Sequence, residues 1–367
     1  MDTSELKAWL ALWTVPNIGP IRYVSLVKHF GSPEKVLAAS AKELAELPDV
    51  GPVTAASIRS SVSWETAEEQ LRLCEKNQVQ VVTFKDQGYP KNLLTVYDPP
   101  PILFVGGEIK EQDRSAVAMV GCRSASSYGR RITERISREL VRTGITIVSG
   151  MARGIDSIGH QAALKEKGRT LAVFGSGLDV PYPPENKRLA GQIKSSGAII
   201  SEFPLGTQPE APNFPRRNRL ISGLSLGVVI VEAGNKSGAL LTAQCALEQN
   251  REVFAIPGNL DSKNSQGTNR LIKEGAKLVT AVEDILEELP VSARVEKSGF
   301  PAQPQRDLSG LSPAERNMFE LISDEPHHID KIASQASVGV PQALSTLLSL
   351  ELKGLVKQLS GKVFVRA

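Results

Sequence analysis

The sequence predicts an α/β protein in which a doubly wound, mostly parallel sheet carries helices on both faces, and three observations lead to that prediction. Between residues 115 and 289, short apolar runs alternate with helical patterns. Several of these runs end in glycine-rich loops. A helical segment comes before this region, and a polar, proline-bearing stretch comes after it. We therefore expect a helical domain at 1–75, an α/β core at 76–289, a linker at 290–309 and a last domain at 310–367.

The composition is that of an ordinary soluble globular protein, with 41% hydrophobic and 23% charged residues. The net charge is only +3, but residues 115–289 hold 22 Lys and Arg against 17 Asp and Glu, so the positive charge is concentrated in the core. The three cysteines have no C-x-x-C spacing, which argues against a disulfide framework or a zinc site. No secretion signal and no apolar run of membrane-spanning length is recognised, so we expect a cytoplasmic protein without a membrane span.

The helical segment contains two similar turns, at residues 15–22 and 47–54, each ordered apolar, Pro, polar, apolar, Gly, Pro, apolar. The turns lie between helical patterns at 6–13, 23–30, 33–39, 41–47 and 54–61, and this arrangement predicts paired helix-hairpin-helix units. Such turns can offer backbone N–H groups to phosphate, or they can simply pack two helices. Because residues 1–75 hold 7 basic and 10 acidic side chains, packing is the favoured interpretation.

The core region is expected to form its sheet from six apolar runs, at 116–120, 145–149, 170–174, 198–201, 228–232 and 252–256. Helices are expected between them, at 128–142, 157–167, 184–195, 213–224 and 238–249. In sheets of this kind, ligands bind outside the carboxyl ends of the strands. Four glycine-rich loops follow such ends and predict one shared site, at 121–124, 149–154, 175–177 and 234–238.

The stretch at 213–257 has the strongest signal for an anion site. Three arginines lie within residues 216–219, and an apolar strand follows them. The turn after this strand opens a helix, whose free N–H groups lie beside a lysine and the three arginines. We interpret this stretch as a phosphate site, with a solvated arginine cluster and an ordinary helix cap as the alternative.

Two familiar nucleotide motifs are absent. A dinucleotide fold would place G-x-G-x-x-G after the first core strand, but Gly121 is followed by its next glycine only at Gly129. No G-x-x-x-x-G-K-[ST] occurs, which disfavours ATP hydrolysis by a P-loop.

Possible acid and base residues have simpler interpretations. Asp156 and His160 share a helix face, but a helix cap and a packed histidine are favoured over an acid-base pair. Glu202 and Glu232 both end strands, and we expect them to orient arginines by ion pairing rather than to catalyse.

The last domain has helical patterns at 313–322, 329–334 and 341–353, followed by a hairpin over 355–366. This order is typical of a winged helix-turn-helix, and His327 and His328 fall in one of its turns. Residues 311–367 hold 6 Lys and Arg and 6 Asp and Glu. That neutral balance favours protein contact or packing over duplex DNA binding.

Taken together, these motifs resemble the DNA-processing protein A family, called DprA or Smf. The matching segments are VGCR at 120–123 with SYG at 127–129, SGMARGIDSIGHQAAL from 149, AVFGSGLDVPYPPEN from 172, ISEFPLG from 200, FPRRNRLISGLS from 214, VEAGNKSGALLTA from 231, and PGN at 257–259 with GTN at 267–269. They cover residues 120–275. The resemblance implies an extended Rossmann-like core, a SAM-like helix-hairpin-helix N-terminal domain and a winged-helix C-terminal domain.

Members of this family bind single-stranded DNA without sequence preference and load the RecA recombinase onto it, as in natural transformation. The resemblance therefore implies a recombination mediator that protects incoming or exposed single strands. It also implies a homodimer formed through the core, and contact with single-strand-binding protein only indirectly through the DNA. No catalytic residue, metal or cofactor is expected, and the protein is expected not to be an enzyme.

The family's motifs also imply which residues bind DNA. Arg123 and the arginines at 216–219 are expected to contact phosphates, Phe214 to stack on a base, and the helix start to hold a phosphate. One position departs from the family, which usually has Ser or Thr where Cys122 stands, so a hydroxyl contact is in question there. The expected DNA-binding residues are Gly121, Arg123, Ser149, Gly150, Phe214, Arg216, Arg217, Asn218, Arg219, Lys236, Ser237 and Gly238.

An alternative from another class is a Rossmann-type enzyme that processes nucleoside monophosphates. Related lysine-decarboxylase-like proteins carry P-G-G-x-G-T-x-x-E, and residues 257–259 of this chain do not extend to that motif. A winged-helix transcription regulator whose core senses a phosphorylated metabolite is a weaker alternative, because the last domain is neutral.

Overall fold

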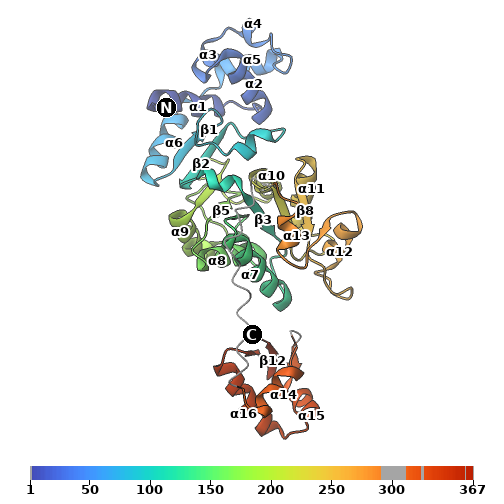
Figure 1. Ribbon diagram of the computed structural model, residues 1–367. Helices are drawn as coiled ribbons and strands as arrows, with labels where there is room; N and C mark the ends of the chain where they lie inside the picture. The colour runs from blue at the N-terminus through green and yellow to red at the C-terminus, as the bar shows by residue number, and fades with distance from the viewer. Residues whose placement is uncertain (1, 291–310, 324–325, 360, 367) are drawn as a thin grey trace. The chain divides into compact units, whose positions relative to one another are not determined.

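The computed structural model describes residues 2–290, 311–323, 326–359 and 361–366. These residues form two compact units (Figure 1). The first contains the helical segment and the core, and the second contains the last domain. Except for residue 290, the expected linker lies outside the described residues.

Six helices open the first unit: α1 (Thr3–Trp13), α2 (Pro20–Phe30), α3 (Pro33–Ala38), α4 (Ala41–Leu44), α5 (Pro52–Ser60) and α6 (Trp64–Lys76). Gly19 and Gly51 are the N-caps of α2 and α5, and each is followed by a proline suited to the first helical position. Arg22 joins the two turns, since its guanidinium donates 2.6 Å hydrogen bonds to the carbonyls of Asn17 and Asp49. The hairpins therefore pack against each other, as their similar sequences suggest.

This helical segment is packed onto the core. The buried ring of Trp9 lies edge-on to Phe84, with 5.4 Å between the ring centroids. Its other neighbour, Tyr23, stacks at 5.8 Å and donates a 2.7 Å hydrogen bond to the Trp9 carbonyl. Gln70 of α6 exchanges hydrogen bonds with the backbone of Leu205. One hydrophobic cluster thus continues from the helices into the sheet.

The core sheet has nine strands in the described residues: β1 (Gln80–Thr83), β2 (Ile102–Gly107), β3 (Ala116–Val120), β4 (Thr146–Ser149), β5 (Thr170–Val173), β6 (Ala198–Ser201), β7 (Gly227–Ile230), β8 (Glu252–Ala255) and β9 (Lys277–Leu278). Their order is β1-β2-β6-β5-β4-β3-β7-β8-β9. Strand β2 is antiparallel to both neighbours, and every pair from β6 to β9 is parallel. The strands expected at 116–120 and 198–201 have these bounds, because fully buried parallel strands are continuous apolar runs.

Helices cover both faces of this sheet: α7 (Ser127–Arg142), α8 (Ile155–Lys165), α9 (Lys187–Ser196), α10 (Asn213–Leu224), α11 (Gly238–Glu248), α12 (Gln266–Lys273) and α13 (Glu283–Leu286). Apolar side chains of α10 and α11 pack on one face, and those of α7 and α13 on the other. The doubly wound fold class is confirmed. The sequence did not predict the helices α6, α12 and α13, the strand β9, or the 3-10 helices η1 (Lys91–Thr95) and η2 (Glu111–Arg114). The third 3-10 helix, η3 (Pro184–Asn186), forms the start of the helix expected at 184–195.

Chain order and spatial order together define a switch point in the sheet. From β3 the chain adds β4, β5 and β6 on one side, and then returns to place β7, β8 and β9 on the other side. The loops that leave β3 and β7 therefore diverge at the same edge. Open α/β sheets bind ligands in the crevice that forms at such a point.

The second unit contains α14 (Pro313–Leu321), α15 (Ile329–Gln335) and α16 (Val340–Leu352), with the strands β10 (His327–His328), β11 (Val356–Leu359) and β12 (Val363–Arg366). The strands form an antiparallel sheet in the order β10-β12-β11. Three helices and this sheet confirm the winged helix. The histidines expected in a turn instead pair with β12, and His328 also caps α15.

Candidate nucleic-acid interface

A cleft of about 870 Å³ lies at the switch point, outside the carboxyl ends of β3 and β7. Its walls come from the loop after β3, the start of α10, and the turn that opens α11. Eight of the twelve residues expected to bind DNA line it: Gly121, Arg123, Phe214, Arg217, Asn218, Lys236, Ser237 and Gly238. The convergence of separate loops on one edge, expected from the sequence, is thus present.

The loop after β3 is held in shape by Glu232. The buried carboxylate of Glu232 accepts hydrogen bonds from the N–H and the hydroxyl of Ser126. Gly121 allows the close approach, because a Cβ there would lie 2.6 Å from Cγ1 of Ile155. Glu232 was expected to orient arginines. That expectation is wrong, since its carboxylate instead bonds Ser126 and Cys122.

Cys122 acts as a donor in this loop. Its backbone N–H donates to the Glu232 carbonyl at 2.8 Å, and its thiol donates to the Glu232 carboxylate at 3.3 Å. Burial, reinforced by the nearby negative charge of Glu232, raises the pKa of the Cys122 thiol to about 12. The thiol therefore stays protonated at neutral pH and turns toward the loop-shaping carboxylate.

Two exposed cations flank the cleft. The guanidinium carbon of Arg123 lies 5.9 Å from the centroid of the Phe214 ring, and Lys236 stands on the turn before α11. Within the described parts of the chain, neither side chain forms an ion pair or a hydrogen bond. The charges of Arg123 and Lys236 are therefore available to an anionic ligand.

The start of α11 adds backbone donors to these cations. Ser237 is the N-cap, and its hydroxyl accepts from the N–H of Ala239 at 3.3 Å. The N–H of Ser237 itself donates to the Gly234 carbonyl at 3.0 Å, which closes the turn. Gly238 begins the helix, where N–H groups have no acceptor within the helix and favour anions. Of the two N–H groups expected to hold a phosphate, that of Gly238 is the better placed.

Arg217 is buried in the floor of the cleft, with only 5% of its surface exposed. Its guanidinium donates to the Gly150 carbonyl at 2.6 Å and to the Val173 carbonyl, so it links the loop after β4 to the end of β5. Burial lowers the pKa of Arg217 to about 10. Gly150 leaves the necessary space, because a Cβ there would lie 2.5 Å from the guanidinium.

Ser149 and Gly150 do not line the cleft, although the sequence placed them in the site. The hydroxyl of Ser149 is buried and donates to the Met119 carbonyl at 2.6 Å. Both residues therefore lie beneath the floor of the cleft and support it. Asn218 does reach the cleft, and its amide makes long bonds of 3.4 Å to Arg217 and to the Gly238 carbonyl.

Arg216 and Arg219 also lie outside the cleft lining and pair with Glu202. Arg219 is nearly buried, and it also bonds Asp98 through the carboxylate at 3.2 Å and the carbonyl at 2.7 Å. Arg216 is half exposed, and its guanidinium carbon lies 5.2 Å from the Phe203 ring centroid. Burial raises the pKa of Glu202, which the two arginines oppose. The expected role of Glu202 in orienting arginines is confirmed.

A second aromatic residue of the cleft was not expected from the sequence. Tyr182 lines the cleft beside Phe214, with 5.5 Å between the ring centroids and a tilt of 46°. The sequence feature that could have identified Tyr182 is its position as an aromatic residue in the loop after the third core strand, within the segment AVFGSGLDVPYPPEN. The cleft therefore offers two adjacent rings to a base.

The acid and base candidates are engaged inside the protein. The buried carboxylate of Asp156 accepts from the N–H groups of Gly150 at 3.1 Å and Ala152 at 3.2 Å. His160 is fully buried, its Nδ1 lies 2.6 Å from the hydroxyl of Thr170, and burial lowers its pKa to about 3. The packed histidine is confirmed. The expected helix cap is wrong, because the N-cap of α8 is Gly154 and Asp156 instead bonds the N–H groups of the preceding loop.

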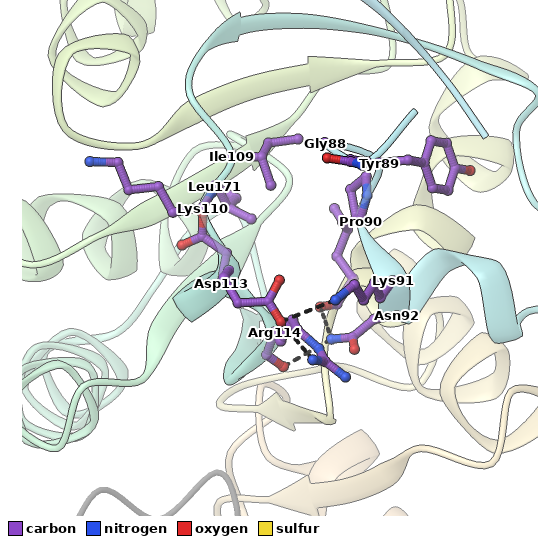
Figure 2. Close-up of a pocket in the computed structure, with 13 residues that line it drawn as sticks. Gly88, Tyr89, Pro90, Lys91, Asn92, Ile109, Lys110, Asp113, Arg114 and Leu171 are labelled. Carbon is purple, nitrogen blue, oxygen red and sulfur yellow. Dashed lines mark hydrogen bonds and ion pairs between the residues drawn. The ribbon is translucent and has the colours of Figure 1, made fainter. Parts of the chain in front are cut away.

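A second cavity, of about 50 Å³, lies away from this edge, between the segment at 87–92 and the segment at 109–114 (Figure 2). Its buried acid, Asp113, accepts hydrogen bonds from the Lys110 N–H, the Thr146 hydroxyl and the Arg169 guanidinium. These bonds saturate the carboxylate and fix the start of β4. The small cavity is therefore part of the packing of the sheet.

No cluster of three or more His, Cys, Asp or Glu side chains that could hold a metal ion is found among the described residues. The helices in those parts of the chain include none that is long and apolar enough to cross a membrane.

Residues 80–290 match the model of a family described as DNA recombination-mediator protein A. The chain belongs to this family. A DprA winged helix domain model matches residues 301–362, and a SAM-like helix-hairpin-helix tandem model matches residues 10–62. The resemblance found in the sequence motifs is confirmed.

Relatives of the DprA family cover much of the chain. Protein Smf of Escherichia coli (strain K12) is 41% identical over 310 residues, which are 83% of this chain and 80% of that protein. DNA processing protein DprA of Bacillus subtilis (strain 168) is 42% identical over 213 residues, which are 58% of this chain and 72% of that protein.

Two solved DprA structures share the fold. The X-ray structure of DprA from Streptococcus pneumoniae has a TM-score of 0.69 and 33% identity, and covers 77% of this chain and 98% of that chain. A structure of DprA from Helicobacter pylori, described for the single-stranded DNA binding mode of that protein, has a TM-score of 0.52 and 31% identity. It covers 58% of this chain and 99% of that chain.

Proposed function

We propose that this protein is a single-stranded DNA-binding recombination mediator and that the strand lies in the cleft at the switch point. The observation that carries the proposal is the composition of that cleft. Arg123 and Lys236 are exposed there without intramolecular ion pairs among the described residues, the start of α11 opens beside them, and Tyr182 and Phe214 present two rings. Binding of single strands without sequence preference requires cations for phosphates and aromatic faces for bases.

The roles of the predicted residues differ under this proposal. Arg123, Lys236 and the N–H of Gly238 contact phosphates, and Phe214 and Tyr182 stack on bases. Gly121 and Asn218 shape the walls, while Ser149, Gly150 and Arg217 form the support beneath. Arg216 and Arg219 position the helix α10 through Glu202, with Arg216 close enough to solvent to add long-range attraction.

The family implies the biological setting. We infer that the protein is cytoplasmic, protects incoming or exposed single strands, loads RecA onto them as in natural transformation, and acts as a homodimer. It meets single-strand-binding protein through the shared DNA. A strand-exchange assay on DNA covered with single-strand-binding protein tests this: addition of this protein should shorten the lag before RecA activity, and an unchanged lag contradicts RecA loading.

We infer binding rather than catalysis. The acids nearest the cleft are held by backbone and hydroxyl donors, with Glu232 bonded to Ser126 and Asp156 bonded to Gly150 and Ala152. An acid or base for nucleotide chemistry must reach the proton that it transfers. The alternative, a nucleoside-monophosphate-processing enzyme, predicts release of free base or phosphate from a monophosphate panel at enzymatic rates.

One titration tests the proposed ligand. Fluorescence anisotropy would compare oligothymidine, the matching duplex and thymidine monophosphate over a range of NaCl concentrations. We expect the oligothymidine to bind most tightly, and its affinity to fall steeply with salt, because each phosphate contact releases condensed counterions. Tighter binding of the monophosphate, or equal binding of duplex and single strand, would contradict the proposal.

A further inference from the structure

Helix α7 begins directly beside the cleft. The loop that lines the cleft with Arg123 and Ser124 ends at Ser126, the N-cap of α7. Tyr128, in the first turn of the helix, is 37% exposed, and its hydroxyl donates to the Pro257 carbonyl at 2.8 Å. This bond holds an accessible aromatic ring at the rim of the cleft.

A stripe of arginines continues along α7 from this ring. Arg131, Arg135, Arg138 and Arg142 follow one another at intervals of four, three and four residues, which places them on one helix face. The opposite face holds the buried side chains of the helix, Thr133, Ile136, Ser137 and Leu140. The stripe therefore points away from the core.

The four arginines are not equivalent. Arg138 and Arg142 share the carboxylate of Glu166, at 2.6 Å and 2.9 Å. Arg135 donates instead to the carbonyl of Thr280 at 2.8 Å, which steadies the side chain without cancelling its charge. Arg131 forms no ion pair or hydrogen bond within the described ranges. Uncompensated charge is thus concentrated on the half of the stripe nearest the cleft.

We propose that single-stranded DNA leaving the cleft continues over Tyr128 and binds Arg131 and Arg135 through its phosphates. An aromatic face followed by two cations is the arrangement that holds a single strand without reading its sequence. The path is continuous with the cleft, because one loop and the first turn of α7 join them. It ends before Arg138, where Glu166 neutralises the stripe. This inference rests on the proposed function, since it extends the same ligand.

Two acidic side chains of α7, Glu134 and Glu139, lie close to this path. Glu139 lies near Arg135, is half buried, and burial raises its pKa. Glu134 lies 3.9 Å from Lys165 and is directed toward α8. Neither forms an ion pair with Arg131 or Arg135 in the described part of the chain, so the two arginines keep their charge toward solvent.

The test compares two oligothymidines, one of about six nucleotides that the cleft alone can hold and one of about twenty that can also reach α7. The double variant Arg131→Gln, Arg135→Gln should bind the short oligomer as the parent does. For the long oligomer, the slope of log K against log salt should decrease by about 1.4, since each phosphate contact with a single strand contributes about 0.7. Between 50 and 200 mM salt, that difference amounts to about sevenfold in relative affinity.

The matched control is Arg138→Gln, Arg142→Gln, which removes the same charge, at the same spacing, from the same helix. It should leave both oligomers unaffected. If the two double variants change the affinity for the long oligomer and its salt slope equally, the stripe acts only by general electrostatic attraction, and the inference is overturned. Tyr128→Phe should retain affinity for the long oligomer, and Tyr128→Ala should lose affinity for it. Equal affinities of these two variants for the long oligomer would show that Tyr128 is not part of the path.

The outcomes also separate this inference from the proposed function. If the parent protein binds the short oligomer and the Arg131, Arg135 variant loses nothing on the long one, the path along α7 is wrong and the cleft remains. If the parent binds neither oligomer, the proposed function itself fails.

Discussion

Arg217 donates a 2.6 Å hydrogen bond to the carbonyl of Gly150, so a guanidinium beneath the cleft joins α10 to the loop that follows β4. The same side chain also bonds the Val173 carbonyl. Among the three neighbouring arginines, it is the one whose removal should damage the fold most directly, because two buried carbonyls would lose their donor.

We expect Arg217→Leu to lower the free energy of unfolding by about 1–3 kcal/mol for each carbonyl left without a donor. Urea denaturation followed by circular dichroism measures this loss. DNA affinity should fall together with stability, since the floor of the cleft loosens. A variant as stable as the parent that still fails to bind DNA would instead make Arg217 a direct ligand.

In contrast to Arg217→Leu, Arg123→Ala should weaken DNA binding without lowering stability. Its side chain is exposed and without an ion pair in the described residues, so we expect unchanged stability. Affinity for oligothymidine should fall, and the salt slope should decrease by about 0.7, the contribution of one single-strand phosphate contact. The exposed Arg72 of α6, paired with Glu69, offers a control, and Arg72→Ala should leave both quantities unchanged.

The Glu202–Arg219 pair allows a double-mutant cycle. Glu202→Gln or Arg219→Gln alone should each destabilise the core, by less than the ~3–5 kcal/mol of a wholly unpaired buried charge, because Glu202 keeps Arg216 and Arg219 keeps Asp98 as a second partner. The double variant should cost less than the sum of the two single variants. Thermal and urea unfolding measure all four proteins. Strict additivity would show that the pair is not coupled.

His160 should make the core acid-sensitive. Burial lowers its pKa to about 3 in the folded state, whereas the unfolded chain takes up the proton near pH 6.5. A base with a depressed folded pKa stabilises the fold above pH 6.5 and loses that contribution as pH falls toward 3. Between pH 7 and pH 5 the loss is about 2 kcal/mol. Urea midpoints across this range should decrease, and His160→Gln should show a shallower decrease; equal slopes would contradict the assignment.

Removal of the second unit should leave binding by the core intact. The two units are separately compact, and α16, in the position of a recognition helix, contains no Lys or Arg. A chain that ends at residue 309 should therefore bind oligothymidine with the affinity and salt slope of the full chain. Weaker binding by the shorter chain would assign part of the DNA contact to the winged helix.

The sheet could be predicted from sequence because its strands are buried on both sides and are therefore continuous apolar runs bounded by glycine. Shorter elements gave no such signal: α13 spans only Glu283–Leu286, and β9 only Lys277–Leu278. Helix α6 was missed for a different reason. It buries only Ala67 and Cys74, and the rest of its sequence is mostly polar.

The site was predicted as a region more accurately than as individual contacts. Arg216, Arg217 and Arg219 are close in sequence, but successive residues of a helix point in directions about 100° apart. The three side chains consequently enter solvent, the cleft floor and a buried ion pair. Only the packing of α10 against β4 and β5 decides which arginine takes which of these environments, and no local sequence pattern contains that information. Tyr182 was missed because a lone aromatic residue in a loop has no periodicity.

The central strand β3 pairs with β4 on one side and with β7 on the other, although β7 is translated only after the whole succession from β4 to α10. A growing chain on the ribosome therefore exposes one bare edge of an entirely apolar strand until residues 227–230 emerge. Unpaired edges of this kind recruit other chains and seed aggregation. Premature termination between β4 and β7 should consequently yield an insoluble fragment, and a chaperone that shields nascent strands should improve the yield of the complete protein.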